Sequence, residues 1–345
     1  MAVVLLMHIP FFVYPILRLC DWLQFSLWLT LVIFFPLAGS QIVSRVYLRH
    51  NRSTWARWLR LAADFWMGVT PILLLTLLIF EPIVFAGLVP AESAALIIVG
   101  VSLLCGIIGL LAAINPVVKK VMFASPRLRN EVRFVQISDV HVGSRSKAFL
   151  EGVVGKIIQL EPDFVCITGD FIDAGGVLES DIGSLNLIEA PVFFCTGNHE
   201  KYEDLDEIVK LLTSLGVTVL RNETGRFRED VQVIGIDDME DALQVKNQLR
   251  HIDVDESAFT LLLYHRPRGL VDAAKAGVDL MLCGHTHNGQ IVPFNLLVNR
   301  VFDMAKGMYE HGDTRLYVSQ GTGTWGPVMR LGTQGEITLF EISPE

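Results

Sequence analysis

Apolar residues are unevenly distributed along the chain, and long uninterrupted runs of them occupy its first third. The runs cover residues 2–19, 23–39, 65–89 and 94–114. About 20 consecutive apolar residues suffice for a helix to cross the hydrocarbon core of a bilayer. The pattern therefore predicts an N-terminal bundle of about four transmembrane helices. The first two runs are short and contain Pro10, Pro15 and Pro36, so a re-entrant hairpin stays open as an alternative for this pair.

Beyond residue 131 the pattern changes to short apolar segments that alternate with amphipathic ones. Runs rich in β-branched and aromatic residues predict strands at 132–138, 163–169, 190–197, 217–220, 231–236, 259–264, 278–284, 315–321 and 336–342. Helical spacing appears at 147–160 and 203–215. This order favours an α/β protein with a mixed central sheet. Pro116 and Pro126 mark residues 116–131 as a linker, so we expect a transmembrane domain at 1–115 and a second domain at 132–345.

The balance of basic and acidic residues also differs between the first third of the chain and the rest. Residues 1–134 carry 11 Lys and Arg against 5 Asp and Glu, whereas residues 135–345 carry 17 against 32. The basic residues of the first part gather after the second apolar run and after the fourth. Because basic loops stay on the cytoplasmic side, four spans would place the second domain in the cytoplasm of a multi-pass inner-membrane protein. The acidic second domain would repel nucleic-acid phosphates, which disfavours nucleic acid as a partner.

The basic stretch 44–66 alternates arginines with Trp55, Trp58 and Trp66. One interpretation is an ordinary cytoplasmic loop with interfacial tryptophans. The other is a basic amphipathic helix that lies on the inner leaflet. Either interpretation predicts contact with the membrane.

Polar residues that can bind metals follow five of the predicted strands. They are Asp139, His141, Asp170, Asn198, His265, His285 and His287. In open α/β sheets, ligands bind beyond the carboxyl ends of the strands, so these side chains are expected to meet. Clustered carboxylates and imidazoles need a cation between them, and seven ligands exceed the four of a tetrahedral zinc site. Two divalent cations that share one carboxylate would use them all, with His285 and His287 directed at different ions.

The motifs DxH, GDxxD, GNHE, a lone His and GHxH occur here in this order, and each follows a predicted strand. Residues 132–343 thereby resemble the calcineurin-like metallophosphoesterase superfamily. The resemblance implies a mixed β-sheet sandwich flanked by helices. It also implies one metal held by Asp139, His141, Asp170 and His287, and a second held by Asp170, Asn198, His265 and His285, with Asp170 as the bridge. Among the divalent metals that suit these oxygen and nitrogen ligands, Mn²⁺ is favoured over Fe²⁺ and Zn²⁺.

The resemblance also implies a reaction. A hydroxide between the two cations would attack phosphorus in line, and His199 would protonate the leaving group as general acid. Asp173 and Glu200 would accept hydrogen bonds that orient imidazoles. Asp170 would contribute to catalysis as the bridging ligand.

The tail after residue 317 and the segment GHTHNGQI resemble a membrane-associated bacterial branch of this superfamily, which includes membrane-bound UDP-2,3-diacylglucosamine pyrophosphohydrolases. This resemblance favours a phosphate ester or pyrophosphate of a lipid-linked substrate at the inner leaflet, with Arg145 and Arg330 as candidate phosphate contacts. The alternative is a membrane-anchored phosphodiesterase that acts on soluble substrates such as cyclic nucleotides. A non-catalytic metal-dependent scaffold is disfavoured, because His199 and all seven ligands are present. GTGTWG at 321–326 satisfies GxGxxG, but Pro327 follows it and a hairpin is expected there, which argues against a nucleotide-binding loop.

Overall fold

The computed structural model describes residues 8–48, 51 and 53–345, and the chain divides into two compact units. One unit, here called the helical unit, ends at Ala112 but also includes residues 326–331. The other, the sheet unit, comprises residues 113–325 and 332–345. The chain therefore passes between the units three times. The domain limits drawn from the sequence remain predictions.

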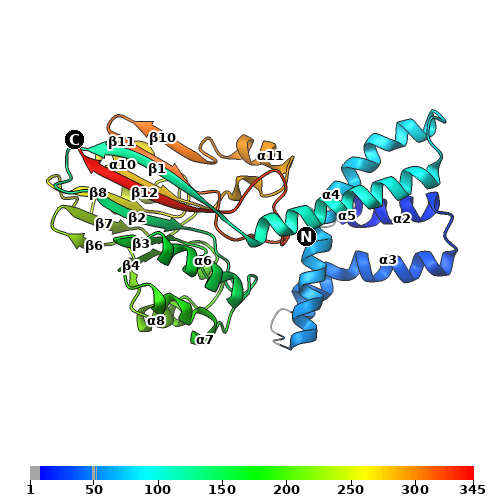
Figure 1. Ribbon diagram of the computed structural model, residues 1–345, viewed down its shortest axis with the longest axis horizontal. Helices are drawn as coiled ribbons and strands as arrows, with labels where there is room; N and C mark the ends of the chain where they lie inside the picture. Colours follow the sequence, from blue (N-terminus) through cyan, green and yellow to red (C-terminus); the bar gives the residue numbers. More distant parts are fainter. Residues whose placement is uncertain (1–7, 49–50, 52) are drawn as a thin grey trace. The chain divides into compact units, whose positions relative to one another are not determined.

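The helical unit is built from a short first helix and three long ones (Figure 1). The elements are η1 (Ile9–Val13), α2 (Tyr14–Trp22), α3 (Leu27–Ile42), η2 (Val43–Tyr47), α4 (Thr54–Phe85) and α5 (Ala91–Ile114). Within the described part of the chain, three helices are long and apolar enough to cross a membrane: 27–47, 54–85 and 91–114. The first expected span is represented by η1 and α2 alone, and its residues 1–7 lie outside the described part. A total of four spans therefore stays a prediction.

The described part of the basic stretch 44–66 is mostly helical, which differs from an ordinary loop, whereas contact of this helix with the inner leaflet stays a prediction. Helix α4 begins at Thr54 and continues through the third apolar run to Phe85 without a break. Residues 54–64 contain neither Gly nor Pro, and Ala, Leu and Arg are strong helix formers. Arg60 donates to the carbonyl oxygens of Leu48 and Asn51, at 2.6 Å each, and so ties the preceding turn to the helix. The tryptophans at 55 and 58 are consequently on the first turns of a long helix.

Residues 326–331, from the tail of the sequence, pack inside the helical unit instead of forming the expected hairpin. The Met329 side chain fills the space beside Gly68, where an added Cβ would lie 2.6 Å from the Met329 Cε. The Arg330 backbone N–H donates to the Gly109 carbonyl at 2.8 Å. Both Met329 and Arg330 are buried. The absence of side chains at Gly68 and Gly109 is therefore what allows the tail to approach α4 and α5.

The sheet unit contains two six-stranded mixed sheets. The strands of the first, in spatial order, are β1 (Val117–Ser125), β12 (Glu336–Pro344), β2 (Val132–Ile137), β3 (Phe164–Thr168), β4 (Val192–Cys195) and β5 (Thr218–Val219). Those of the second are β10 (Gly307–His311), β11 (Thr314–Val318), β9 (Leu280–Cys283), β8 (Phe259–Leu263), β7 (Val231–Gly235) and β6 (Glu223–Arg228). Strand β12 pairs in parallel with β1 and antiparallel with β2. The α/β sandwich expected from the resemblance is confirmed. The single central sheet expected from the order of the elements is instead two sheets.

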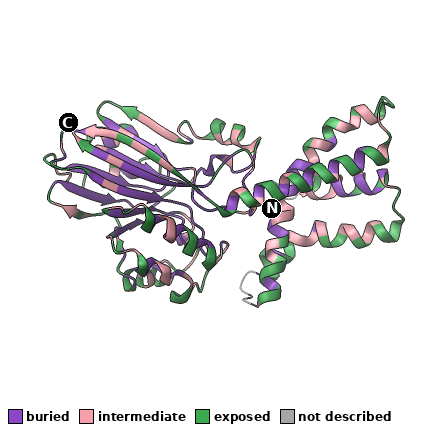
Figure 2. Cartoon of the chain, in the orientation of Figure 1, coloured by how far each residue is buried: buried purple, intermediate pink, exposed green. Residues whose placement is uncertain are grey.

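Apolar side chains fill the space between the sheets, and helices cover their outer faces. Phe134 stacks on Phe164 and on Phe340, with ring centroids 4.8 Å apart in each pair. Helices α6 (Lys147–Gln159), α7 (Glu179–Ile182) and α8 (Leu205–Ser214), with the 3-10 helix η3 (Gly183–Leu187), accompany the first sheet, and α9 (Gln244–Leu249) and α10 (Leu270–Lys275) pack on the second. Figure 2 shows the strands buried along most of their length. This packing fixes the ends of the central strands.

Residues 117–125, which the sequence placed in a linker, form the edge strand β1. Its residues Val117 to Ser125 pair one by one with Glu336 to Pro344. Lys120 forms an ion pair with Glu341 at 2.5 Å. Lysines in the middle of a strand are typical of edges, where they discourage pairing with another chain. Only Asn115 and Pro116 separate this strand from the end of α5.

Candidate dimetal centre

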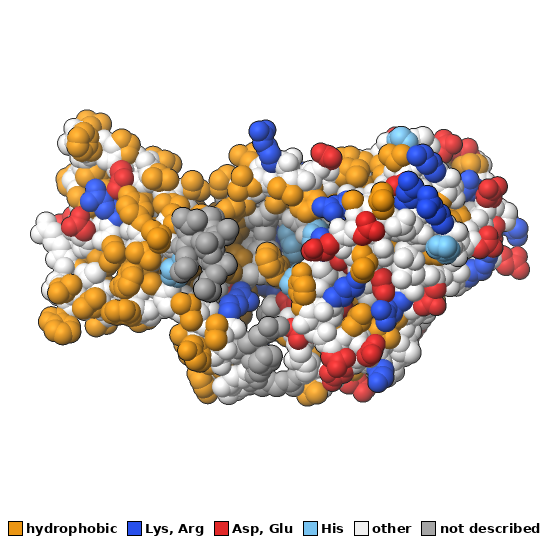
Figure 3. All heavy atoms as spheres, turned by 180° about the vertical axis from the view of Figure 1, so that it is seen from behind, with side chains coloured by type: hydrophobic (Ala, Val, Ile, Leu, Met, Phe, Trp, Pro, Cys, Tyr) orange, Lys and Arg blue, Asp and Glu red, His pale blue; other side chains and the backbone are white. Residues whose placement is uncertain are grey.

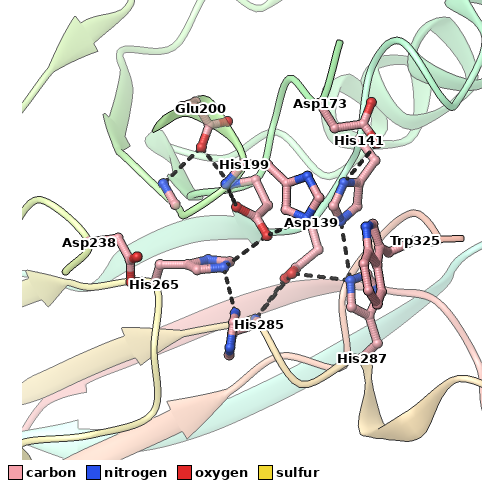
Figure 4. A network of polar contacts seen from close by, with 12 residues as sticks. Asp139, His141, Asp173, His199, Glu200, Asp238, His265, His285, His287 and Trp325 are labelled. Atoms are coloured by element: carbon pink, nitrogen blue, oxygen red, sulfur yellow. Dashed lines mark hydrogen bonds and ion pairs between the residues drawn. The ribbon is translucent and has the colours of Figure 1, made fainter. Parts of the chain in front are cut away.

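The predicted ligands come from loops at the carboxyl ends of five strands, and the fold brings them together (Figure 4). Strands β2, β3 and β4 of one sheet pair in parallel, as do β8 and β9 of the other. Their ends therefore point to one edge of the sandwich. The 3-10 helices η4 (Glu200–Tyr202) and η5 (His287–Gly289) begin in these loops. The site is thus a meeting point of both sheets.

Two groups of three predicted ligands have the spacing of metal ligands. A third group, formed by His141, Asp173 and His199, has this spacing too and shares His141 with the first. In the first group, His287 Nε2 lies 3.2 Å from His141 Nε2 and 3.3 Å from Asp139 Oδ1. In the second, His265 Nε2 lies 3.1 Å from Asp170 Oδ2 and 3.1 Å from His285 Nδ1. Ligands that each lie about 2.1 Å from a common ion stand about 3–3.4 Å apart. Each of the two groups of predicted ligands can therefore hold one cation.

Two of the histidine rings, those of His141 and His265, are oriented by an acceptor at Nδ1, the ring nitrogen that faces away from the other ligands. Asp173 Oδ2 lies 3.1 Å from His141 Nδ1, and the Thr168 carbonyl oxygen lies 2.8 Å from His265 Nδ1. A proton on each Nδ1 leaves the lone pair of Nε2 for a cation. Asp173 also accepts from the Ser144 N–H, which fixes its own position.

Asn198 supplies an independent test of whether the site suits cations. Its side-chain oxygen is buried and has no hydrogen-bond partner. A buried carbonyl oxygen without a partner costs about 1–3 kcal/mol, so such atoms usually serve a purpose. An amide oxygen is a suitable ligand for a hard divalent cation. The residues present therefore fit a metal centre.

The backbone at the site is held in a conformation that side-chain-bearing residues rarely adopt. Five predicted ligands have positive φ, namely Asp139, His141, Asp170, His285 and His287. Each such residue costs about 1–3 kcal/mol, and such residues cluster at functional sites. Gly284 shows how closely the loops pack, since a Cβ there would lie 1.9 Å from Ser138 Oγ and 2.3 Å from Asp139 Oδ2.

Comparisons with known proteins agree with this geometry. The calcineurin-like phosphoesterase family profile matches residues 132–289. An uncharacterized metallophosphoesterase of Campylobacter jejuni is 32% identical over 240 residues, which are 66% of this chain and 63% of that protein. A transmembrane protein with metallophosphoesterase domain from Danio rerio is 30% identical over 329 residues, 81% of this chain and 73% of that one. The chain belongs to the calcineurin-like phosphoesterase family.

Members of this family use two divalent metals, in agreement with the two ligand groups. The chain spans slightly less than two thirds of the length of the Campylobacter relative. A solved dimetal phosphatase from Danio rerio is 12% identical, with a TM-score of 0.35 over 55% of this chain and 87% of that one.

In the candidate site, Asp170 and His265 form an ion pair in which each shifts the pKa of the other. Burial alone would lower the pKa of His265, but the Asp170 carboxylate outweighs it and raises this pKa to about 10. In turn, attraction to His265 overcomes the burial of Asp170 and holds the pKa of that carboxyl well below its usual range. Burial, followed by the charge of His265, lowers the pKa of His285 to about 3. A cation entering this group must displace the His265 proton, so binding is expected to release a proton.

Glu200 holds two of the site loops together. Its buried carboxylate accepts backbone N–H groups of Asp170, Phe171, Ile172 and Gly197, at 2.6–3.0 Å. It thus binds backbone and not an imidazole, contrary to what the sequence led us to expect. Burial, together with the charge of Asp170, raises the pKa of Glu200 to about 7. The carboxylate therefore positions the turn that presents Asp170.

Replacing Glu200 by Gln is expected to loosen this turn. An amide has one acceptor oxygen, and its NH₂ group would face a backbone donor, so at least one hydrogen bond to a charged group is lost. We expect unfolding free energy to fall by about 2–3 kcal/mol and metal affinity to fall about 10–100-fold. Thermal unfolding and metal titration measure these effects. Glu207→Gln on the exposed face of α8 is the matched control, and equal behaviour of the two variants would contradict this role.

His199 lies at the open side of the site. Its backbone N–H donates to Asp170 Oδ1 at 2.8 Å, and its Nε2 lies 4.0 Å from Asp170 Oδ2. The rings of Tyr202 and Trp325 meet the imidazole edge-to-face, at centroid distances of 5.5 and 5.8 Å. Burial lowers the pKa of His199, although Asp170 opposes this change. Sequence reasoning missed both aromatic residues, since a Tyr and a Trp near a motif carry no signal of their own.

The two predicted phosphate contacts have different surroundings. The Arg145 guanidinium is buried, stacks on the Phe149 ring at 4.2 Å and donates to the Ala113 carbonyl at 3.0 Å. Burial lowers the pKa of Arg145 to about 10. This environment favours a structural role over the expected phosphate contact. Arg330 belongs to the helical unit, and its contact with phosphate stays a prediction.

Proposed function

We propose that this protein is a membrane-bound dimetal phosphohydrolase that cleaves a phosphate ester or pyrophosphate of a lipid-linked substrate at the inner leaflet. The observation that carries the proposal is the pair of ligand groups, one around His287 and the other around His265, within a chain that also has three apolar helices.

The residues of the chain divide between the two cations. Asp139, His141 and His287 would hold the first, and Asn198, His265 and His285 the second, with the carboxylate of Asp170 shared. When bound, two divalent cations supply a hydroxide nucleophile at neutral pH and neutralise charge on the phosphoryl group. Asp173 and Thr168 keep the imidazoles of His141 and His265 in the tautomer that binds. The hard oxygen donors Asp139, Asp170 and Asn198 favour Mn²⁺.

In the proposed reaction His199 would act as general acid. Its imidazole adjoins the carboxylate of Asp170. It lies with His141 and Asp173 in the third group of ligand-type side chains, outside the two sets proposed to hold the cations. The ring is partly exposed, so it can exchange its proton with solvent. A proton on Nε2 would pass to the leaving oxygen as the P–O bond breaks.

A membrane substrate is supported by how the two units are joined. Only two residues separate α5 from β1, and three residue steps span at most about 10 Å. If α5 crosses the bilayer, the phosphoesterase fold begins at its surface. The basic residues on the connections between the apolar runs favour a cytoplasmic location for this fold.

The purified full-length protein tests the proposal when it is supplied with Mn²⁺ and a panel of substrates. The panel should contain lipid-linked monophosphates and diphosphates in mixed micelles, a cyclic nucleotide and bis-p-nitrophenyl phosphate. We expect a higher kcat/KM for a lipid-linked substrate than for the soluble ones, measured as released phosphate or nucleoside monophosphate. Hydrolysis of the soluble substrates alone would instead support the anchored phosphodiesterase.

A further inference from the structure

Helix α11 (Phe294–Val301) of the sheet unit carries apolar side chains that the protein does not cover. None of its eight residues is buried. Leu296, Leu297 and Val301 are 64%, 62% and 71% exposed, and the preceding Val292 is 42% exposed. Exposed apolar residues are unremarkable when scattered singly, but four within ten residues form a patch. We call these four residues the α11 patch.

The α11 patch is attached directly to the metal site. Its helix begins seven residues after His287, at the end of the loop that carries the GHxH motif. At the other end of the helix, the Phe302 ring meets His285 edge-to-face at 5.6 Å. The loop before α11 therefore carries one predicted metal ligand, and the residue after the helix contacts another, so α11 adjoins the site.

Charge around the patch differs from charge on the rest of the unit. Residues 291–306 contain two basic residues, Arg300 and Lys306, and one acidic residue, Asp303, whereas residues 135–345 carry 32 acidic and 17 basic residues. On the face that Figure 3 draws, charged side chains are spread over the sheet unit and apolar ones over the helical unit. An anionic bilayer would repel the acidic surface and attract Arg300. This distribution would select the orientation in which α11 faces the lipid.

We infer that α11 lies in the interfacial region of the bilayer, with Leu297 and Val301 among the acyl chains, and presents the metal site to lipid phosphates. An amphipathic helix typically buries its apolar face about 5–10 Å into this region. If α5 crosses the bilayer, the two-residue link between α5 and β1 limits how far the sheet unit can lie from the membrane, which makes lipid the occupant that the chain favours. The role in presenting substrate rests on the proposed function, but the position of the helix does not.

Spin labels on the full-length protein in anionic proteoliposomes would locate the helix. Cys20, Cys166, Cys195 and Cys283 are buried, so replacing the half-buried Cys105 by Ala leaves introduced cysteines as the accessible ones. Labels would be placed by Leu297→Cys and Val301→Cys, with Leu187→Cys on η3, 63% exposed, as the matched control. We expect the α11 labels to collide more often with dissolved oxygen than with an aqueous nickel chelate, and the control to show the reverse. Labels on α11 that behave like the control would overturn the inference. So would immobilised labels shielded from both reagents, because they would indicate a second copy, a partner protein or the helical unit on this face.

A charge variant separates this inference from the proposed function. Leu297→Asp with Val301→Asp places two carboxylates at the anionic surface, each unfavourable by about 1 kcal/mol, or fivefold. We expect the ratio of the rate on lipid-linked substrate to that on bis-p-nitrophenyl phosphate to fall at least about tenfold. Leu187→Asp should leave the ratio unchanged. An unchanged ratio in the α11 variant would contradict the presenting role. Wild-type protein that hydrolyses nothing, with α11 labels in the bilayer, would refute the proposed function and leave the position of the helix intact.

Discussion

Replacing Asp170 by Asn is expected to abolish phosphoester hydrolysis and to remove at least one of the two metals. The carboxylate of Asp170 lies 3.1 Å from His265 Nε2, and an amide has only one oxygen to offer where the proposal needs two anionic ones. Loss of an outer hydrogen-bond partner typically costs about 10–100-fold in metal affinity or activity, and loss of a shared ligand should exceed this range. Elemental analysis and turnover of the purified variant measure both effects.

A matched control for this substitution lies at the other end of the same strand. Asp163 precedes β3 and accepts the Arg133 N–H at 2.7 Å, so Asp163→Asn makes the same chemical change outside the site. We expect the control to keep two metals per chain and wild-type turnover. If Asp170→Asn keeps both metals and its rate, the ligand assignment is wrong.

Replacing His199 by Ala should slow hydrolysis by about 10²–10⁴-fold when the leaving group is a poor one, as expected for loss of a general acid. The loss should be much smaller for p-nitrophenyl esters, because nitrophenolate leaves without a proton. Metal content should be unchanged, since the side chain is in neither of the two ligand sets proposed for the cations. Rates on an alkyl phosphoester and an aryl phosphoester, measured in parallel, separate the acid from a merely structural residue.

The pH profile provides a second test of His199. Burial lowers the pKa of this imidazole, and a general acid acts in its protonated form. The rate on a poor leaving group should therefore fall as pH rises through that lowered pKa. His199→Gln, which keeps a hydrogen-bonding side chain but cannot titrate, should lack this limb. A profile identical to that of the wild type would exclude His199 as the acid.

The sequence was sufficient to predict the central strands of the fold but not their neighbours. Strands β2, β3, β4, β7, β8 and β9 are buried, and their continuous apolar runs are distinctive. The strands that were missed, β1, β6 and β10, all lie at edges of the two sheets. Their segments contain Lys, Arg, Glu and Gly, because one side of an edge strand faces solvent. Without these strands the second sheet could not be recognised as separate.

The candidate site, too, could be predicted only in part from the sequence. The ligand motifs could be recognised because each needs particular residue types at particular spacing, and the fold brings them together at one edge. The surroundings of individual side chains were harder to predict, since the burial of a side chain depends on the whole fold. Arg145 stacks on Phe149 in the interior, Glu200 binds backbone in place of an imidazole, and Trp325 borders His199.

Strand β12 has a consequence for biosynthesis. It lies between β1 and β2, yet the ribosome makes it about 200 residues later than either, as the pairing of Val117 with Glu336 shows. Until then β1 and β2 each lack a hydrogen-bonding neighbour, while the preceding helices are already available to the insertion apparatus. Contacts this distant in sequence form slowly, and open strand edges invite aggregation. The nascent chain should therefore depend on chaperones during this interval, and a chain terminated before β12 should be degraded.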